Sequence, residues 1–324
     1  MKVLFIRFSS IGDIVLTFPV VTALKEKYPK SHISYLSKNT FIHLLSANKD
    51  IDLSHAYNGS LSTARKWIKD QKFDLIIDLH KNIRSISVSA MNAKKIVRFK
   101  KLNFRKKLFT SFKIDVLPDI HIVDRYFETL KYLGLNESIT RSPFYVPTDD
   151  QVEVKNIFDA IPNKFYCIAL GAKFNTKKIP YSVLVKVIDQ INVPIALLGD
   201  SNDAEIGSKL QDAFKNKTIV NCAGNYNILQ SASILQQSAK LITGDTGLMH
   251  IASFFELDII SIWGNTTPKF GMSPYRKISN PNDVIIEKHQ LNCRPCSKIG
   301  YDQCPKGHFK CMAHEPTEII KAIG

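Results

Sequence analysis

The chain has 324 residues, of which 44% are hydrophobic and 23% are charged, and its formal net charge at pH 7 is +15. These proportions are typical of a soluble globular protein, and the length suffices for two domains that each bury a core. The sequence contains no run of 18 apolar residues and no signal peptide, which argues against a transmembrane span and predicts a cytoplasmic protein.

Short apolar runs alternate with segments of helical spacing along the whole chain. In the first half, strands are predicted over residues 3–6, 32–36, 74–78 and 95–98, and helices over 14–27, 61–70 and 124–133. In the second half, strands are predicted over 165–170, 194–198, 218–221, 240–243 and 258–262, and helices over 181–190, 203–215, 227–237 and 247–255, with a closing helix over 315–323. This alternation predicts an α/β protein with two parallel, doubly wound sheets, one in residues 1–150 and one in residues 151–324.

The first predicted strand leads into a small polar loop, Ser9 to Asp13, before the helix predicted over 14–27. Asp13 therefore lies at the carboxyl end of a strand, where open α/β sheets bind their ligands. A carboxylate at a helix start is also an ordinary N-cap, so the position alone leaves both interpretations open.

The strand predicted over 240–243 also ends in a polar turn. Asp245 and Thr246 are good N-cap residues, and Gly247 leaves room for a ligand near the free N–H groups of the following helix, which favour phosphate. His250 lies one helical turn further and could reach the same ligand. The alternative is an ordinary capped turn between a strand and a helix.

Taken together, four motifs resemble those of glycosyltransferase family 9, the heptosyltransferases that build the inner core of lipopolysaccharide. They are Arg7-x-Ser9-x-Ile11-Gly12-Asp13; Gly171-Ala172-Lys173 with Lys177-Lys178-Ile179-Pro180; Leu197-Leu198-Gly199-Asp200 with Glu205; and Asp245-Thr246-Gly247-x-Met249-His250-Ile251-Ala252. They occur in the order found in the family and span about residues 3–270. Ile179 is a small departure, because the family usually has a bulkier residue there.

The resemblance implies a GT-B fold, in which two Rossmann-like domains face each other across a cleft. It places the acceptor on the N-terminal domain and the nucleotide sugar on the C-terminal domain. It further implies an inverting transferase that moves a heptose, expected to come from ADP-heptose, to a lipopolysaccharide inner-core acceptor. Asp13 would be the general base and Lys177 the cation that contacts the diphosphate. Apart from the resemblance, Lys173 and Lys178 flank Lys177 and could substitute for it.

Further site residues follow from their positions beside these motifs. The predicted donor site comprises Lys177, Glu205, Asp245, Thr246, Gly247 and His250, and the predicted acceptor site comprises Ser9, Ser10, Gly12, Lys81 and Arg84. Glu205 fits a surface helix as well as it fits a contact to ribose, and a solvated loop explains Lys81 and Arg84 nearly as well as acceptor binding does. We also expect partial desolvation to strengthen Asp13 as a base. No Asp-x-Asp motif occurs, so no catalytic metal is required.

The segment 94–113 contains nine basic residues and no acidic one, with aromatic and aliphatic residues interleaved. Such a segment predicts peripheral binding to the anionic inner face of the inner membrane, or to a phosphorylated lipid headgroup. The alternative is a solvated basic loop. Nucleic acid is not expected as a partner, because no nucleic-acid-binding motif accompanies the charge, and the protein is expected to be a monomer.

Four of the six cysteines lie near the C-terminus, at Cys293, Cys296, Cys304 and Cys311. Four thiolates could hold a structural zinc ion, but only the first pair has the usual ligand spacing, so free thiols packed in a loop are the favoured interpretation. Cys167 and Cys222 lie in or after predicted strands and are expected in the core.

Two other functions fit part of the pattern. One is a nucleotide-sugar epimerase of the GT-B type, which needs no acceptor. The other is a non-enzymatic basic binding module. The basic segment argues against a soluble epimerase, and the Asp13 loop and the turn at 245–250 argue against a mere binding module.

Overall fold

The computed structural model describes residues 1–90, 93–135 and 139–323. The chain forms two compact units, which we call unit 1 (Met1–Leu102 and Ile120–Pro147) and unit 2 (Asn103–Asp119 and Thr148–Gly324). The segment 103–119, which the sequence pattern assigns to the first domain, therefore groups with unit 2. In the described ranges, no helix is both long enough and apolar enough to cross a membrane.

Unit 1 is built on a five-stranded parallel sheet with the order β3-β2-β1-β4-β5. Its strands are β1 (Lys2–Ile6), β2 (His32–Lys38), β3 (Leu53–Tyr57), β4 (Phe73–Asp78) and β5 (Ala93–Arg98). Its helices are α1 (Ile11–Val15), α2 (Phe18–Lys27), α3 (Leu61–Gln71), α4 (Ile83–Ser89) and α6 (Ile122–Phe127). The central strand β1 is buried from Val3 to Ile6, which explains why it reads as a continuous apolar run.

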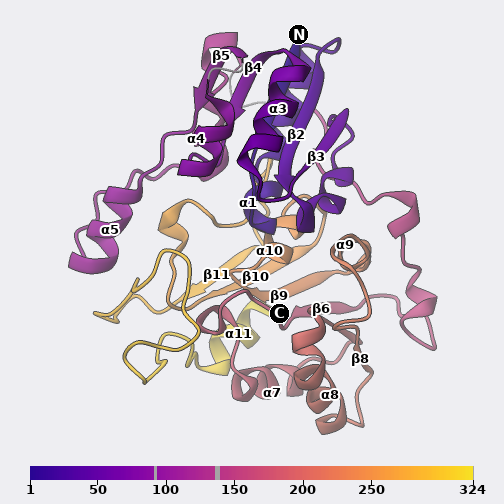
Figure 1. The fold of residues 1–324 in the computed structure, drawn as a ribbon. Coiled ribbons are helices and arrows are strands. Elements are labelled where there is room, and N and C mark those ends of the chain that lie inside the picture. The colour runs from indigo at the N-terminus through magenta and orange to yellow at the C-terminus, as the bar shows by residue number, and fades with distance from the viewer. Residues whose placement is uncertain (91–92, 136–138, 324) are drawn as a thin grey trace. The chain divides into compact units, whose positions relative to one another are not determined.

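Unit 2 contains a six-stranded parallel sheet with the order β11-β10-β9-β6-β7-β8. Its strands are β6 (Tyr166–Ala169), β7 (Ile195–Leu198), β8 (Ile219–Asn221), β9 (Lys240–Gly244), β10 (Asp258–Trp263) and β11 (Val284–Glu287). Its helices are α5 (Asn103–Phe112), α7 (Tyr181–Asp189), α8 (Ala204–Ala213), α9 (Ile228–Gln237), α10 (Gly247–Ala252) and α11 (Pro316–Ile323). In Figure 1, α7, α8 and α11 cover one face of this sheet, and α9 and α10 cover the other.

Both sheets reverse their strand order at one point. In unit 1 the chain adds β2 and β3 on one side of β1 and then β4 and β5 on the other; in unit 2 it does the same around β6, with β9 as the first strand on the other side. Ligands of open α/β sheets bind outside the carboxyl ends of the two strands that flank such a reversal. The predicted doubly wound α/β architecture is therefore confirmed, and it selects two places as candidate sites.

Four elements of the structure are missing from the predicted pattern. The strands β3 and β11 and the helices α4 and α5 were not predicted. β3 is an edge strand of mixed polar and apolar residues, and α4 begins at the capping box formed by Asn82 and Ser85 inside a run that reads as polar.

Two predicted helices have different bounds. The helix expected over 14–27 is split into α1 and α2. Helix α1 begins at Ile11 because Ser10 and Asp13 form a capping box. Asp13 therefore lies within the first turn of α1 and not in a loop before it. The helix expected over 124–133 ends at Phe127, and residues 131–133 form a separate 3₁₀ turn.

Candidate functional site

The candidate site of unit 1 lies at the carboxyl ends of β1 and β4. The chain leaves β1 through Arg7 and Ser9–Ser10 into α1, and it leaves β4 through residues 79–82 into α4. The two exits lie side by side because β1 and β4 are neighbours in register, with Ile6 opposite Asp78. The predicted acceptor residues Ser9, Ser10, Gly12, Lys81 and Arg84 all belong to these two exits.

Asp13 is held by a network of charged and polar contacts. Its carboxylate lies 2.6 Å from the Arg7 guanidinium and accepts hydrogen bonds from the backbone N–H and the hydroxyl of Ser10. Arg7 also donates to the carbonyl oxygens of Ser9 and Leu79, at 2.8 and 2.7 Å, and to the Tyr126 hydroxyl at 3.2 Å. Arg7 thus ties the exit of β1 to the exit of β4 and to α6.

This network makes Asp13 a weaker base than the sequence suggested. Burial disfavours the charged carboxylate, but the Arg7 charge and the Ser10 hydrogen bonds outweigh burial and lower the pKa of Asp13 to about 2. The expectation that desolvation would strengthen this base is therefore wrong, because it left out the Arg7 cation of the same motif. The side chain remains 21% exposed, so a substrate can still reach it.

The exit of β4 is shaped by Asp78, which is completely buried. One carboxylate oxygen of Asp78 accepts hydrogen bonds from the backbone N–H groups of His80 and Lys81, and the other accepts from the Ser85 hydroxyl at 2.9 Å. Burial raises the pKa of Asp78 despite these hydrogen bonds. Asp78 therefore fixes the turn that carries Lys81, whose φ is 44°, and the start of the helix that carries Arg84.

His80 was not singled out from the sequence, although it lies in the same exit. Its ring packs against Phe8 at a centroid distance of 5.2 Å, and burial together with the nearby cations Arg7 and Lys101 lowers the pKa of His80 to about 3. Its Nδ1 is buried and accepts no hydrogen bond from the residues that the structure describes. The only signal in the sequence was its place in a polar run directly after a strand.

The candidate site of unit 2 lies at the carboxyl ends of β6 and β9. Lys177 comes from the loop after β6, and Asp245 follows β9 directly. The Lys177 ammonium lies 2.7 Å from the Asp245 carboxylate, with side chains 17% and 10% exposed, and the Thr266 hydroxyl donates to the same carboxylate at 2.9 Å. Two separate sequence motifs therefore meet in one contact.

The close approach of these two loops depends on Gly244. A Cβ atom at this position would lie 2.2 Å from the carbonyl oxygen of Lys177, a distance that real Cβ atoms do not reach. Glycine at the end of β9 therefore lets the Lys177 loop lie directly against the strand.

Thr246 has the predicted N-cap role. Its hydroxyl accepts a hydrogen bond from the backbone N–H of Met249 and pairs with the Thr243 hydroxyl at 2.9 Å. Gly247 is the first residue of α10, and its half-buried position leaves part of it accessible. His250 belongs to the same short helix, but its side chain is only 3% exposed.

The other predicted donor residues lie further from this contact. Lys178 pairs with the buried Asp203 at 2.7 Å and so joins the loop after β6 to the loop after β7. Lys173 is exposed and lies over the Phe174 ring. Glu205 is exposed on α8 and pairs with Lys209 one turn along, an arrangement that matches the surface-helix interpretation.

Asn265 is a buried polar residue that the sequence analysis missed. It follows β10, the neighbour of β9, and is 1% exposed. Neither its side-chain oxygen nor its side-chain nitrogen has a hydrogen-bond partner among the described residues, which is unusual for a buried amide. Its backbone carbonyl accepts from the N–H groups of Cys296 and Ser297, so this strand end is attached to the cysteine-containing tail.

The tail cysteines are all free thiols, of which Cys311 is buried and the other three are partly buried. Burial raises the pKa of Cys296 and Cys311, and the charges of the neighbouring cysteines raise it further. Cys293 lies 3.9 Å from His308. Within the described ranges, no group of three or more His, Cys, Asp or Glu side chains is arranged to hold a metal ion. Cys167 and Cys222 are buried, as expected.

Comparison with known proteins identifies the family. The family model of glycosyltransferase family 9 (heptosyltransferase) matches residues 62–305. The chain belongs to this family. The lipopolysaccharide core heptosyltransferase OpsX of Haemophilus influenzae is 22% identical over 93% of this chain and 90% of its own length.

Two solved structures share the fold over nearly the whole chain. One is a family 9 glycosyltransferase from Veillonella parvula, with a TM-score of 0.76, 18% identity, and coverage of 99% of this chain and 96% of that one. The other is the Escherichia coli ADP-heptose lps heptosyltransferase II, with a TM-score of 0.73, 17% identity, and coverage of 100% and 97%. The predicted GT-B fold is confirmed.

Family membership decides between the functional hypotheses. The protein is a glycosyltransferase of family 9, the heptosyltransferases, as the four motifs predicted. The epimerase and the non-enzymatic binding module are set aside, because neither is a transferase of this family.

Proposed function

We propose that this protein transfers a heptose from ADP-heptose to an inner-core acceptor of lipopolysaccharide, with inversion at the anomeric carbon. Residues 1–150 would bind the acceptor and residues 151–324 the donor. The observation that carries the proposal is the contact between Lys177 and Asp245, which joins two family motifs at the strand-order reversal of unit 2. The names of OpsX and of the E. coli enzyme support the choice of donor and acceptor.

Asp13 accepts the proton of the attacking hydroxyl in this proposal. The acceptor oxygen forms a bond to the anomeric carbon, the bond from that carbon to the diphosphate oxygen breaks, and the hydroxyl proton passes to the Asp13 carboxylate. A carboxylate whose pKa is about 2 is too weak a base to deprotonate a neutral hydroxyl before the reaction begins. The proton therefore leaves late, after bond formation has made the hydroxyl acidic, and Arg7 keeps the carboxylate ionised and in place until then.

Lys177 stabilises the leaving diphosphate. Its ammonium exchanges Asp245 for the phosphate oxygens, while Thr246 and Gly247 offer backbone N–H groups at the start of α10. A charge-assisted hydrogen bond of this kind contributes about 1.5–3 kcal/mol. His250 and Glu205 complete the proposed donor site, and Ser9, Ser10, Gly12, Lys81 and Arg84 the proposed acceptor site, where the two cations suit an acidic saccharide.

The same proposal places the enzyme, as a monomer, at the cytoplasmic face of the inner membrane. The support is the basic segment 94–113, which carries no acidic residue. Anionic vesicles should sediment the protein at low salt and release it at high salt, as the screening length shortens from about 10 Å at 0.1 M towards about 3 Å at 1 M. Equal binding to neutral and anionic vesicles would contradict an electrostatic attachment.

A structural zinc ion on Cys293, Cys296, Cys304 and Cys311 is a separate proposal. Its support is that the four cysteines belong to one tail without a helix or strand between Glu287 and Pro316, although no three of them are arranged as metal ligands in the described ranges. Elemental analysis of the purified protein tests this proposal. One zinc ion per chain in the wild type, and none in the Cys296→Ser variant, would support it. A metal-free protein of unchanged stability would identify the four cysteines as packed thiols.

The test of the main proposal begins with the nucleotide. A thermal-shift panel with ADP, UDP, GDP and CMP should show the largest stabilisation with ADP, because a ligand that binds only the folded state raises its stability. Heptose transfer from ADP-heptose to an inner-core acceptor, followed by ADP release, tests the reaction itself. Stronger stabilisation by UDP, GDP or CMP would change the donor and leave the family assignment intact.

A further inference from the structure

Helix α5 has an unusual surface for a helix of a folded protein. None of its ten residues is buried. Phe104 and Phe112 are 74% and 67% exposed, although such large apolar side chains are normally covered.

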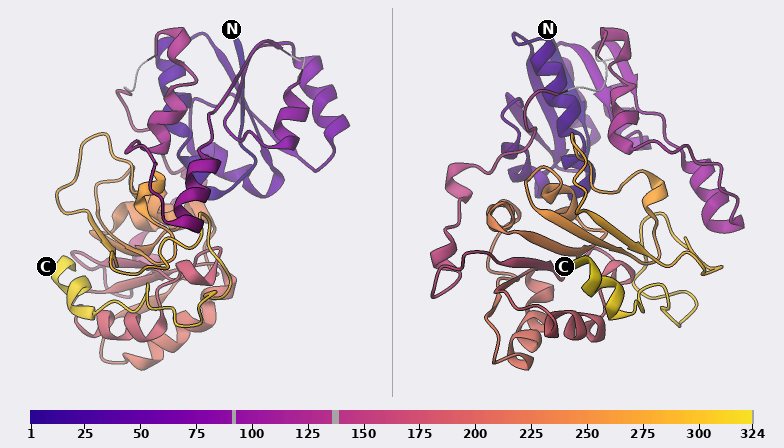
Figure 2. Two further views of the ribbon diagram at one scale, coloured as in Figure 1. Left: turned by 90° about the vertical axis from the view of Figure 1, so that its left-hand side faces the viewer. Right: turned by 180° about the vertical axis from the view of Figure 1, so that it is seen from behind.

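The helix nevertheless has fixed contacts within unit 2. The Lys106 ammonium donates to the carbonyl oxygen of Phe270 at 3.1 Å, and Phe109 packs edge-on against the Phe270 ring. The Lys113 ammonium donates to the carbonyl oxygens of Cys293 and Pro295, at 3.0 and 2.8 Å. These contacts bring α5 beside the tail loops, as the left view of Figure 2 shows.

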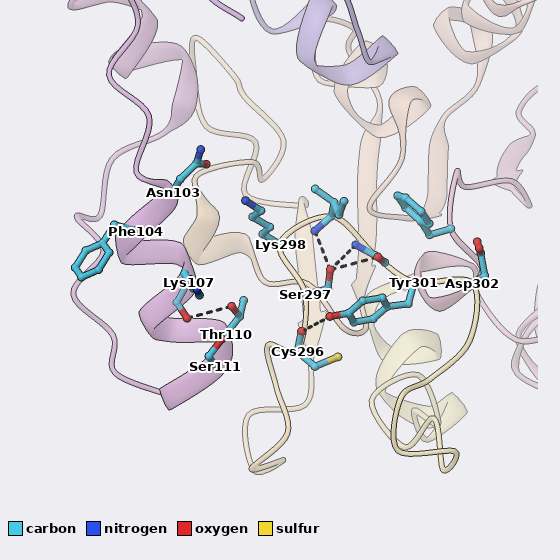
Figure 3. Close-up of a pocket in the computed structure, with 13 residues that line it drawn as sticks. Asn103, Phe104, Lys107, Thr110, Ser111, Cys296, Ser297, Lys298, Tyr301 and Asp302 are labelled. Carbon is cyan, nitrogen blue, oxygen red and sulfur yellow. Dashed lines mark hydrogen bonds between the residues drawn. The ribbon is translucent and has the colours of Figure 1, made fainter. Parts of the chain in front are cut away.

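A cavity of about 720 Å³ lies between α5 and the tail. Its apolar walls include Phe174, Ile299 and Tyr301, and Gly300 packs so closely on Phe174 that a Cβ atom there would lie 2.7 Å from that side chain. Figure 3 shows Thr110 and Ser111 on the side of α5 that faces the tail, while the Phe104 ring lies on the outer side of the helix. The volume is in the usual range for a site that holds a small ligand.

Two lysines stand at the edge of this cavity. Lys107 on α5 and Lys298 on the tail are both exposed, and neither ammonium has an ion-pair or hydrogen-bonding partner in the part of the chain that the structure describes. Asp302 is the one acidic residue among those that line the cavity. The cavity therefore combines an apolar wall with the amide and hydroxyl groups of Asn103, Thr110, Ser111 and Ser297, and its edge attracts anions.

We propose that this cavity holds an acyl chain of an anionic membrane phospholipid, with the lipid phosphate on Lys107 and Lys298. Charge complementarity selects this occupant: the basic segment lacks acidic residues, and the apolar walls suit a hydrocarbon chain. A protein partner fits less well, because the cores of protein interfaces are depleted in lysine. The proposal rests on the proposed membrane attachment and adds a defined lipid site, beside which Phe104 and Phe112 enter the interface.

Fluorescence quenching by brominated lipids tests the cavity directly. In the Ile299→Trp variant, vesicles of phosphatidylglycerol with brominated acyl chains should quench and blue-shift the new emission. The matched control is Ile278→Trp, because Ile278 is 81% exposed, belongs to unit 2 and does not line the cavity. Equal quenching in both variants, or none in Ile299→Trp, would overturn the proposal.

Charge reversal gives a second readout. The double variant Lys107→Glu/Lys298→Glu should lower the affinity for phosphatidylglycerol vesicles about tenfold or more. The control variant Lys186→Glu/Lys215→Glu changes the net charge by the same amount, at exposed positions of unit 2 outside the cavity. Its affinity for the vesicles should fall much less. Equal losses would assign the effect to net charge alone and refute the lipid site.

These outcomes separate the lipid site from the proposals on which it rests. Sedimentation with vesicles but no selective quenching would leave electrostatic attachment standing and remove the site. Absence of any vesicle binding would remove both. Neither measurement uses ADP-heptose or an acceptor, so a failure of the transfer reaction would not affect them.

Discussion

The two candidate sites contain the same kind of pair, a cation against an aspartate, but the two cations are held very differently. Arg7 lies 2.6 Å from Asp13, and Lys177 lies 2.7 Å from Asp245, each pair at a reversal of strand order. Arg7 also donates to three other oxygens, on Ser9, Leu79 and Tyr126. Lys177 has only the one charged partner in the described residues.

This difference indicates a division of labour. A guanidinium with several donors in a rigid plane can hold a carboxylate and the surrounding backbone at once, whereas an ammonium on a flexible stem exchanges one anion for another at small cost. We therefore expect Arg7 to act as a positioning residue for Asp13, and Lys177 to be released from Asp245 when a diphosphate binds.

The largest effect is expected from Asp13→Ala. Loss of the proposed base should slow transfer by roughly 10²–10⁴-fold, while the affinity for ADP stays close to that of the wild type, because Asp13 belongs to unit 1. Steady-state kinetics and calorimetric titration with ADP measure the two quantities. Near-normal turnover of a folded variant would remove Asp13 from the mechanism.

Arg7→Ala should act on stability as well as on transfer. It leaves the largely buried Asp13 carboxylate without its cation and removes three further hydrogen bonds, and breaking such a pair costs about 3–5 kcal/mol. Urea unfolding measures the loss. Arg7→Lys keeps the charge but not the fork of donors, so it should recover only part of the stability; full recovery would mean that charge alone accounts for the role of Arg7.

The Lys177→Ala substitution should have an intermediate effect on transfer, and this effect should come from weaker binding of the donor. The loss of one charge-assisted contact predicts an ADP affinity weaker by about 1.5–3 kcal/mol. Stability should also fall, because the largely buried Asp245 carboxylate would lose its cation and keep only the hydrogen bond from Thr266. Calorimetry with ADP measures the affinity, and Lys173→Ala is the matched control, since Lys173 is exposed and pairs with no carboxylate in the described residues. A larger loss in the control would move the diphosphate contact to Lys173.

The smallest effect is a dependence of stability on pH. The pKa of Asp13 is about 2 in the folded protein, below its ordinary value of 3.8, so the ionised carboxylate stabilises the fold above about pH 4 and loses this contribution as the pH falls towards 2. The contribution is about 2 kcal/mol.

Comparison with Asp13→Asn isolates this contribution from other titrating groups such as His80. The difference in unfolding free energy between the wild type and the variant should narrow by about 2 kcal/mol between pH 5 and pH 2. A constant difference would show that Arg7 does not lower the pKa of Asp13.

The sequence predicted those parts of the fold and the site that depend on local pattern. β1 and β9 are buried on both faces and read as apolar runs, and Thr246 caps α10 because its hydroxyl lies three residues before the Met249 N–H that it accepts. The order of the motifs and the resemblance that they carry were enough to predict the family and the paired sheets.

The remainder depends on contacts between distant segments. Arg7 donates to Leu79 and Tyr126, 72 and 119 residues away, and no local pattern shows these contacts, which hold the guanidinium in place beside Asp13. The grouping of α5 with unit 2 likewise depends on Lys113 and carbonyl oxygens about 180 residues away. The sequence motifs indicated which residues belong to the candidate sites. They did not indicate which of these side chains have several partners, as Arg7 has, and which have one charged partner, as Lys177 has.

Anomeric analysis of the product tests the central claim most directly. The wild-type protein is incubated with ADP-heptose and an inner-core acceptor, and the configuration of the new glycosidic bond is determined by nuclear magnetic resonance. The account predicts transfer with inversion, one ADP released per heptose, and loss of the product in Asp13→Ala. Retention of configuration, or undiminished product from the Asp13→Ala protein, would contradict it.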